Sequence, residues 1–593
     1  MTEGEPDSPE GGLTAGAPKR VEPAVHWSLL ALVVLAPVVF HLRWLGAAWR
    51  GELMLGAPLD DGDAIYAHRF AADTLDRVGE AWAASDSIAT FLLSDLWAAA
   101  ATARAYQLVD FVVLLWPARA LFAAEGAFLV ISMALLVLAA IGGGLMARAL
   151  GAGPIGCAAG ALTASASGLV MATASLGQYP QALIGPGLLF FAGLARLRSG
   201  ARGGVVLAGG GAALTLLLYW GNAPILAVGV AAWGLGAWLG YLPVAPGLWR
   251  RLLGAVALAA VLVAPAAAPL FAATGSGDYK LSLVPWGTAL FAENSVREAL
   301  SAVAAEVSPV ALLSPSSGWV LPLLPLLPLA FIALRRRRTL PWVFLLVMGG
   351  VLALGPIPRW PTWLGGHAWP ELSATMMQVP RWMDADALNT EPRARNWVYL
   401  LTFQWVPLAS RMRHPLRWGL LVVAAGVAIV AMGADRLALR RPRWAAAAVV
   451  AGVVWAGLIG PWPLPQSPFP GELAATLRTC EEVLLPSQLP RDVAYRMDAL
   501  HDRPRWPVRY DPHGGFGAPT DSALAESAVR ERGLAAAREG DVSQLPAGAC
   551  VVLLRDSVWG DALSAGLGTP LSLVVPARTL QTGETHLELW RVP

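Results

Sequence analysis

The stretch GAFLVISMALLVLAAIGGGLMAR at residues 126–148 decides the class of this protein, because it runs without a charge until Arg148. About 20 apolar residues in a helix span the hydrocarbon core of a bilayer. Ten further runs are also apolar along most of their length: 27–45, 154–175, 180–197, 203–220, 223–241, 252–273, 318–334, 341–356, 416–434 and 444–462. The sequence therefore predicts a polytopic α-helical membrane protein with eleven transmembrane helices.

The composition of the whole chain supports this interpretation. Of its 593 residues, 56% are hydrophobic and only 14% are charged, whereas about 25% of the residues of a soluble protein carry a charge. This composition excludes an ordinary soluble protein. The net charge of +2 is too balanced to indicate nucleic-acid binding.

Arginines mark one side of the predicted membrane domain. Basic residues in short loops are retained in the cytoplasm. With the N-terminus inside, the connections on the inner side carry Arg148, Arg196, Arg198, Arg202, Arg250, Arg251, Arg335 to Arg338, Arg436, Arg440, Arg441 and Arg443. Arg43 and Arg50, which follow the first helix on the outer side, depart from the pattern. The sequence predicts a multi-pass protein of a bacterial inner membrane, with a cytoplasmic N-terminus and an extracytoplasmic C-terminus.

This topology divides the chain into three parts. Residues 1–25 are rich in Pro, Gly and Glu and are expected to form a disordered cytoplasmic tail. Residues 26–462 form the transmembrane domain, and its long segments, at 48–125, 274–317 and 357–415, all fall on the outer side. Residues 463–593 also fall outside and have a mixed polar composition.

The outer C-terminal segment is expected to be a small α/β domain. Short apolar runs at 483–485, 550–554, 571–575 and 586–592 indicate strands, and residues 521–539 have helical spacing. Cys480 and Cys550 flank two of these strands in an oxidising compartment, where they could form a disulfide. Two unpaired cysteines are the alternative.

The first outer loop carries three carboxylates close together. Asp60, Asp61 and Asp63 lie in the sequence GAPLDDGD, and such a group could act as a general base or hold a divalent cation, Mg²⁺ or Mn²⁺. A solvated turn gives the same pattern. Apolar residues at helical spacing over 87–123 then predict helices that lie along the membrane interface.

The outer segment 357–415 concentrates tryptophans and arginines. Tryptophan is common at membrane interfaces, but its ring also stacks on sugars. A guanidinium group can bind phosphate through two parallel hydrogen bonds. Trp382 and Asp384 are candidate substrate contacts. Arg411, Arg413 and Arg417 are candidate phosphate ligands, and Arg417 is notable because a cation at the start of a membrane span is costly unless it is paired or functional.

Four short motifs occur in a familiar order. They are Gly62-Asp63, Gly177-Gln178, Gly221-Asn222-Ala223-Pro224 and Arg413-His414-Pro415-Leu416-Arg417. Together with an acidic first outer loop, a scaffold of many helices and an outer α/β domain, they resemble large bacterial members of the GT-C superfamily of membrane glycosyltransferases, of the type that glycosylates lipoteichoic acid. Gln178 and Asn222 stand where that family commonly has histidines.

The resemblance implies a hexosyl- or pentosyltransferase. Its donor would be a sugar on a polyprenyl phosphate, its acceptor an envelope glycan or lipid, and its other partners membrane lipids. Asp63, or Asp60 or Asp61, would be the base, and the three arginines would bind the donor phosphate. Gln178, Asn222, Trp382 and Asp384 would contact substrate.

Two other functions remain open. A lipid or polysaccharide transporter would be favoured by facing ionisable residues at mid-membrane, but the centres of the predicted spans carry almost no charge. A non-catalytic envelope scaffold would explain the replacement of the two histidines.

Overall fold

The computed structural model describes residues 23–49, 78–98, 124–167, 184–218, 222–275, 321–334, 337–353, 396–406 and 415–459 of the helical part. In the C-terminal part it describes most of 476–484, together with 532–537, 541–554, 572–579 and 583–592. A few isolated positions lie between these ranges.

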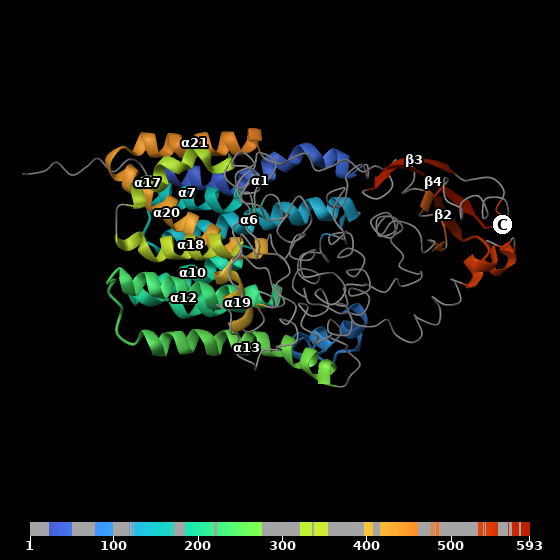
Figure 1. Cartoon of the computed structure of the whole chain (residues 1–593), viewed down its shortest axis with the longest axis horizontal. Helices are drawn as coiled ribbons and strands as arrows, with labels where there is room; N and C mark the ends of the chain where they lie inside the picture. Colours follow the sequence, from blue (N-terminus) through green and yellow to red (C-terminus); the bar gives the residue numbers. More distant parts are fainter. Residues whose placement is uncertain are drawn as a thin grey trace, which may run out of the picture.

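A helix occupies every apolar run that the sequence marks as a span. The helices are α1 (Pro23–Trp49), α6 (Ala124–Ala149), α7 (Pro154–Ser165), α10 (Ile184–Ser199), α11 (Gly204–Leu218), α12 (Ala223–Leu239), α13 (Leu248–Gly275), α17 (Leu327–Leu334) with the preceding 3₁₀ turn η4 (Leu321–Leu326), α18 (Leu340–Ala353), α20 (Gly419–Arg440) and α21 (Pro442–Ile459). They pack side by side in one bundle (Figure 1). A helix suits these runs because it satisfies its own backbone hydrogen bonds in an apolar surrounding.

Three of the described helices are long and apolar enough to cross a membrane. The qualifying segments are Leu129–Ala149, Leu248–Ala268 and Gly419–Arg440. Most of the other apolar helices are shorter than a full span over the residues described. The described part of the chain is therefore mostly helical, with three helices that could cross a membrane, and the number eleven stays a prediction.

Helix α20 forms the centre of the bundle and packs against α7, α17 and α18. The close approach depends on glycine. A Cβ atom on Gly433 would overlap the backbone carbonyl of Leu329 in α17, and one on Gly143 of α6 would lie 2.5 Å from the carbonyl oxygen of Gly160 in α7. Small residues at helix crossings are typical of membrane bundles, where packing rather than the hydrophobic effect holds the helices together.

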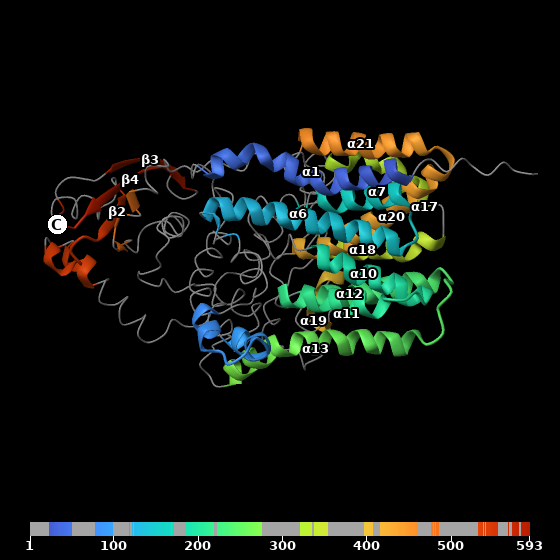
Figure 2. The ribbon, with the colours of Figure 1, turned by 180° about the vertical axis from the view of Figure 1, so that it is seen from behind.

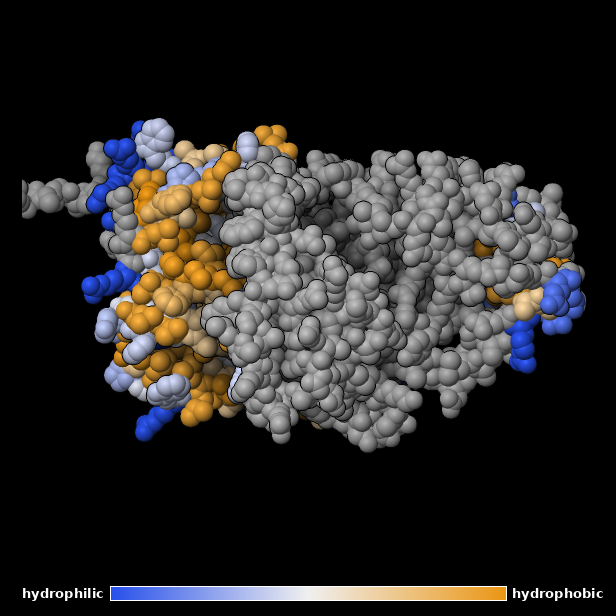
Figure 3. Space-filling view, in the orientation of Figure 1, coloured by the Kyte–Doolittle hydropathy of each residue, from blue (hydrophilic) through white to orange (hydrophobic). Residues whose placement is uncertain are grey.

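The arginine-bearing turns gather at one end of the bundle, which we call the arginine-rich end. It comprises the turns at 149–153, 200–203, 240–247, 337–339 and 441 with the helix ends that flank them. Three hydrogen bonds join parts of it: the Gly153 amide donates to Asp435 Oδ1 (2.8 Å), the Ala245 amide to the Arg198 carbonyl (2.9 Å) and Arg436 Nη1 to the Ile332 carbonyl (3.2 Å). Figure 3 shows hydrophilic residues at this end and a hydrophobic band beside them.

The C-terminal part contains a four-stranded sheet with the order β1-β2-β4-β3. Its strands are β1 (Val483–Leu484), β2 (Cys550–Leu554), β3 (Ser572–Thr579) and β4 (Gly583–Arg591). β1 pairs with β2 in parallel, and the other pairs are antiparallel. The prediction for β2 is confirmed residue by residue. β3 and β4 are longer than predicted because they continue toward each other as a hairpin, past an irregularity between Val574 and Ala577.

One helical turn covers this sheet and completes a small core. Leu534 and Ala537, within the helical segment 532–537, pack with Val551 of β2 and Trp590 of β4. Of the helix predicted over 521–539, residues 521–531 and 538 lie outside the described residues, and Glu539 lies in a turn. Sheet and bundle occupy opposite ends of the long axis of the molecule, and the arginine-rich end is the end of the bundle farther from the sheet (Figures 1 and 2).

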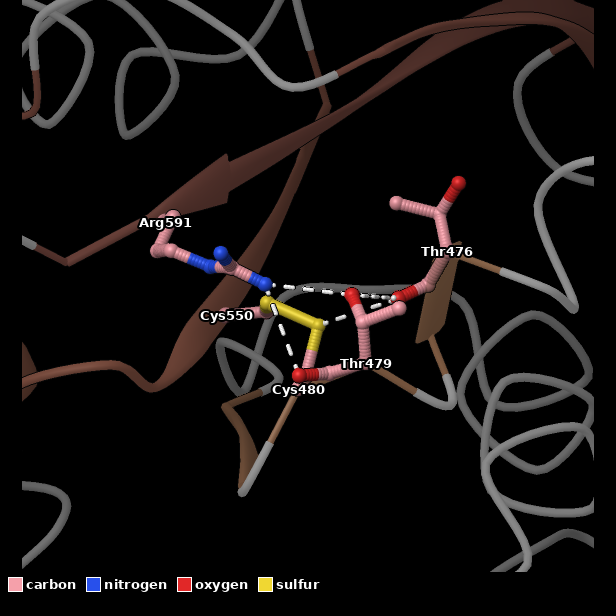
Figure 4. The surroundings of a disulfide bond; sticks show 5 residues. All are labelled: Thr476, Thr479, Cys480, Cys550 and Arg591. Atoms are coloured by element: carbon pink, nitrogen blue, oxygen red, sulfur yellow. Dashed lines mark hydrogen bonds between the residues drawn. A yellow bond between two sulfur atoms is a disulfide. The ribbon is translucent and has the colours of Figure 1, made fainter.

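Cys480 and Cys550 are joined by a disulfide. Their Cα atoms lie 5.7 Å apart, so the proposed pairing is confirmed. The bond ties the segment before β1 to the first residue of β2, and Arg591 of β4 adds hydrogen bonds from Nη2 to the carbonyl (3.4 Å) and hydroxyl (3.1 Å) oxygens of Thr479 (Figure 4). The remaining cysteine, Cys157, is buried in α7.

Candidate functional site at the opposite end of the bundle

Most of the candidate site residues lie outside the described residues. These are Asp60, Asp61, Asp63, Gln178, Trp382, Asp384, Arg411 and Arg413. Asn222 and Arg417 are described, and both lie at the end of the bundle opposite the arginine-rich end, which we call the distal end. The elements around these two residues define the surroundings of the candidate site.

Asn222 is buried in the connection between α11 and α12. Its side-chain Nδ2 donates to the backbone carbonyl of Thr215, 3.3 Å away, and only 7% of the residue is exposed. The Thr215 hydroxyl in turn donates to the Gly211 carbonyl at 2.6 Å. One donor of the Asn222 amide is thus used to hold the end of α11, which gives this residue a structural role that its sequence context did not indicate.

Arg417 lies in η10 (Pro415–Trp418), a 3₁₀ turn that leads into α20. The sequence suggested that Arg417 begins the membrane span, but the regular α-helix starts two residues later, at Gly419. The turn contacts α18, its last residue Trp418 is fully buried, and Arg417 is half-buried. A cation is thereby fixed at the distal end of the bundle on a packed element.

A short helix that sequence analysis missed also packs at this end. α19 (Trp397–Trp405) begins after Asn396, whose Oδ1 accepts from the Tyr399 amide (3.2 Å) and whose Nδ2 donates to the Val351 carbonyl in α18 (2.7 Å). Asparagine before an apolar run is a helix N-cap signal. Burial raises the pKa of Tyr399 above its usual range, so the phenol stays neutral and is unsuited to act as a base.

The segment 78–98 is largely helical and packs on the bundle. After α3 (Ile88–Thr90) the chain forms a π-helical turn, η1 (Phe91–Asp95), within the region predicted to lie along the interface. The Ser85 hydroxyl donates to Asp95 Oδ2 at 2.6 Å. Trp97 then packs against Ala266 of α13, as does Leu217 of α11.

These contacts show which chemistry the described part of the distal end offers. Arg417 supplies positive charge on a packed turn, and Asp95 is engaged with Ser85. Among the residues that the structure describes, no group of three or more His, Cys, Asp or Glu is placed to hold a metal ion, and the three aspartates proposed for that role are not among them. The described residues of this end therefore include a positive charge, that of Arg417, on a packed turn.

No protein-family model matches the chain. No curated protein matches it either.

Proposed function

We propose that this protein transfers a hexose or pentose from a polyprenyl-phosphate donor to an envelope glycan or lipid on the outer face of a bacterial inner membrane. The observation that carries the proposal is the position of Arg417, a half-buried cation on a packed turn at the distal end, where few other described residues are basic. Arg417 would provide the counter-charge for a lipid phosphate at the membrane surface. The order of sequence motifs that resembles GT-C glycosyltransferases supports the same function.

The proposed orientation places the arginine-rich end in the cytoplasm. Positive residues are retained on that side, and the five turns meet at one end of the bundle. The distal end and the disulfide-linked sheet then face outward. An oxidising compartment on that side suits the bond between Cys480 and Cys550.

The elements that flank the acidic segment support a role for it at the distal end. α1 and the helical segment 78–98 lie on opposite sides of the bundle (Figures 1 and 2), and residues 50–77 connect them in the sequence. Asp60, Asp61 and Asp63 belong to this connection. The positions of α1 and of the segment 78–98 are compatible with a location of these aspartates near Arg417.

The proposed reaction uses one base and a group of cations. The carboxylate of Asp63, or of Asp60 or Asp61, takes the proton of the acceptor hydroxyl as the oxygen attacks the anomeric carbon. The bond from that carbon to the phosphate oxygen breaks with inversion, and the electron pair leaves with the lipid phosphate. Arg417, with Arg413 and Arg411, stabilises this charge. Mg²⁺ or Mn²⁺ held by the three aspartates would neutralise the same phosphate.

The orientation is tested by labelling introduced cysteines with a membrane-impermeant maleimide. Asp541→Cys, at an exposed position before β2, should be labelled in intact cells. Arg443→Cys, at an exposed position near the start of α21, should react only after the membrane is opened. Reaction of Arg443→Cys alone in intact cells would invert the topology and remove the basis of the proposed site.

The donor site is tested by a transfer assay with Arg417→Ala. Loss of a charge-assisted contact to phosphate should lower kcat/KM for the lipid-linked sugar about ten-fold or more. Arg443→Ala, at the arginine-rich end, is the matched control and should retain wild-type transfer. Equal activity of the two variants would show that Arg417 does not bind the donor.

A non-catalytic scaffold is the second candidate. The internal hydrogen bond of the Asn222 amide favours it, because it engages one donor that could otherwise reach a substrate. Absence of transfer from a panel of polyprenyl-phosphate sugars, with the lipid-linked substrate still bound, would support that function.

A further inference from the structure

A half-open pocket of about 340 Å³ lies between α17 and α20 at the arginine-rich end. Phe331 and Ile332 of α17 and Arg436, Leu437 and Arg440 of α20 line it. The walls are thus apolar on the α17 side, and two guanidinium groups stand on the α20 side. No carboxylate is among the described residues that line the pocket.

The two arginines share one face of α20. They are four residues apart, a spacing at which like charges in a helix repel each other. The nearest acidic residue in sequence, Asp435, accepts a hydrogen bond from the Gly153 amide at the start of α7 and is therefore engaged with another helix. An anion bound between Arg436 and Arg440 would relieve their repulsion.

Arg436 is held in place by α17. Its Nη1 donates to the backbone carbonyl of Ile332, 3.2 Å away and near the end of that helix. This bond uses one of the five N–H donors of the guanidinium group. The helix dipole of α20 also favours cations in its last turn, but it accounts for neither the pocket nor its apolar wall.

An exposed apolar stripe runs along η4 and α17 to the pocket. Leu324, Leu327, Phe331 and Leu334 follow one another at helical spacing and are all exposed, Phe331 to 68%. Such a stripe on a membrane helix suits a lipid acyl chain. A small soluble phosphate compound would gain nothing from it.

We propose that this pocket binds an anionic phospholipid of the cytoplasmic leaflet. Arg436 and Arg440 contact the headgroup phosphate, and one acyl chain lies along the stripe of η4 and α17. Basic pockets between membrane helices on the cytoplasmic side recognise such headgroups. The site is remote from the distal end, and the proposal does not depend on glycosyl transfer.

The test is lipid binding by the purified full-length protein in detergent, counted by native mass spectrometry. Phosphatidylglycerol should be retained in preference to phosphatidylcholine. Arg440→Gln should weaken phosphatidylglycerol binding roughly five-fold to ten-fold. This variant is preferred to one at Arg436 because Arg440 is exposed and its removal leaves the bond to Ile332 intact.

Matched variants separate this site from its alternatives. Arg443→Gln carries the same change at an exposed position of the same end that does not line the pocket, and it should bind phosphatidylglycerol as the wild type does. Phe331→Ala should weaken lipid binding because it removes part of the acyl-chain surface. Millimolar inorganic phosphate should not displace the lipid.

Three outcomes would overturn the proposal. Equal retention of phosphatidylcholine would show that charge is not recognised. An equal loss in Arg443→Gln and Arg440→Gln would show a diffuse effect of surface charge. Full displacement of the lipid by inorganic phosphate, with Phe331→Ala unchanged, would identify a site for a soluble phosphate compound.

Discussion

Asp63→Asn should abolish glycosyl transfer while leaving the protein folded and in the membrane. Asparagine has nearly the shape of aspartate but cannot take the proton of an acceptor hydroxyl. Removal of a positioned general base lowers the rate roughly 10² to 10⁴-fold. The effect should appear in kcat, with little change in the KM for the donor, because the donor phosphate is proposed to bind the arginines. Initial rates with a radiolabelled polyprenyl-phosphate sugar would measure both constants.

The neighbouring aspartates provide the comparison for this variant. Asp60→Asn and Asp61→Asn identify which of the three carboxylates is the base, since only one should give the large loss of kcat. Asp86→Asn is the matched control, because Asp86 is an exposed aspartate of the same outer loop, and it should retain full activity. Wild-type rates in all three variants of the acidic group would refute the catalytic role and favour the scaffold.

Loss of the disulfide should destabilise the C-terminal unit by about 2 to 4 kcal/mol, on the scale expected for a bridge that closes a long loop. The two cysteines are 70 residues apart, so the bond strongly restricts the unfolded chain. It also fixes the start of β2, where Cys550 is fully buried. The double variant Cys480→Ala/Cys550→Ala should therefore unfold at a lower urea concentration, as judged by proteolysis of the C-terminal region.

Reductant and the third cysteine control this experiment. Dithiothreitol should shift the unfolding midpoint of the wild type toward that of the double variant and leave the double variant unchanged. Cys157→Ala, in α7 and away from the sheet, should not change the response to reductant. A wild-type midpoint that is insensitive to reductant would argue against a bond between Cys480 and Cys550 in the native protein.

Local sequence determined where the helices form and which helix ends belong together. Runs such as 126–148 are apolar on all sides, so a helix is the structure that satisfies their backbone without water. The arginines between the runs identified turns that the structure indeed gathers at one end. Strand β2 could be predicted to the residue because its apolar run, 550–554, is short, follows the turn-forming Pro546-Ala547-Gly548 and ends before Arg555.

Tertiary packing decided what these elements contact and which polar side chains remain available. Asp435 bonds to Gly153, Arg436 to Ile332 and Asn222 to Thr215. None of these partners follows from hydropathy, because neighbouring apolar helices present nearly equivalent surfaces to one another. Close packing at Gly433 selects α17 as a neighbour of α20. Which apolar residues become buried can thus be predicted from the sequence. Which helices become neighbours depends on surface shapes that form only when the helices pack.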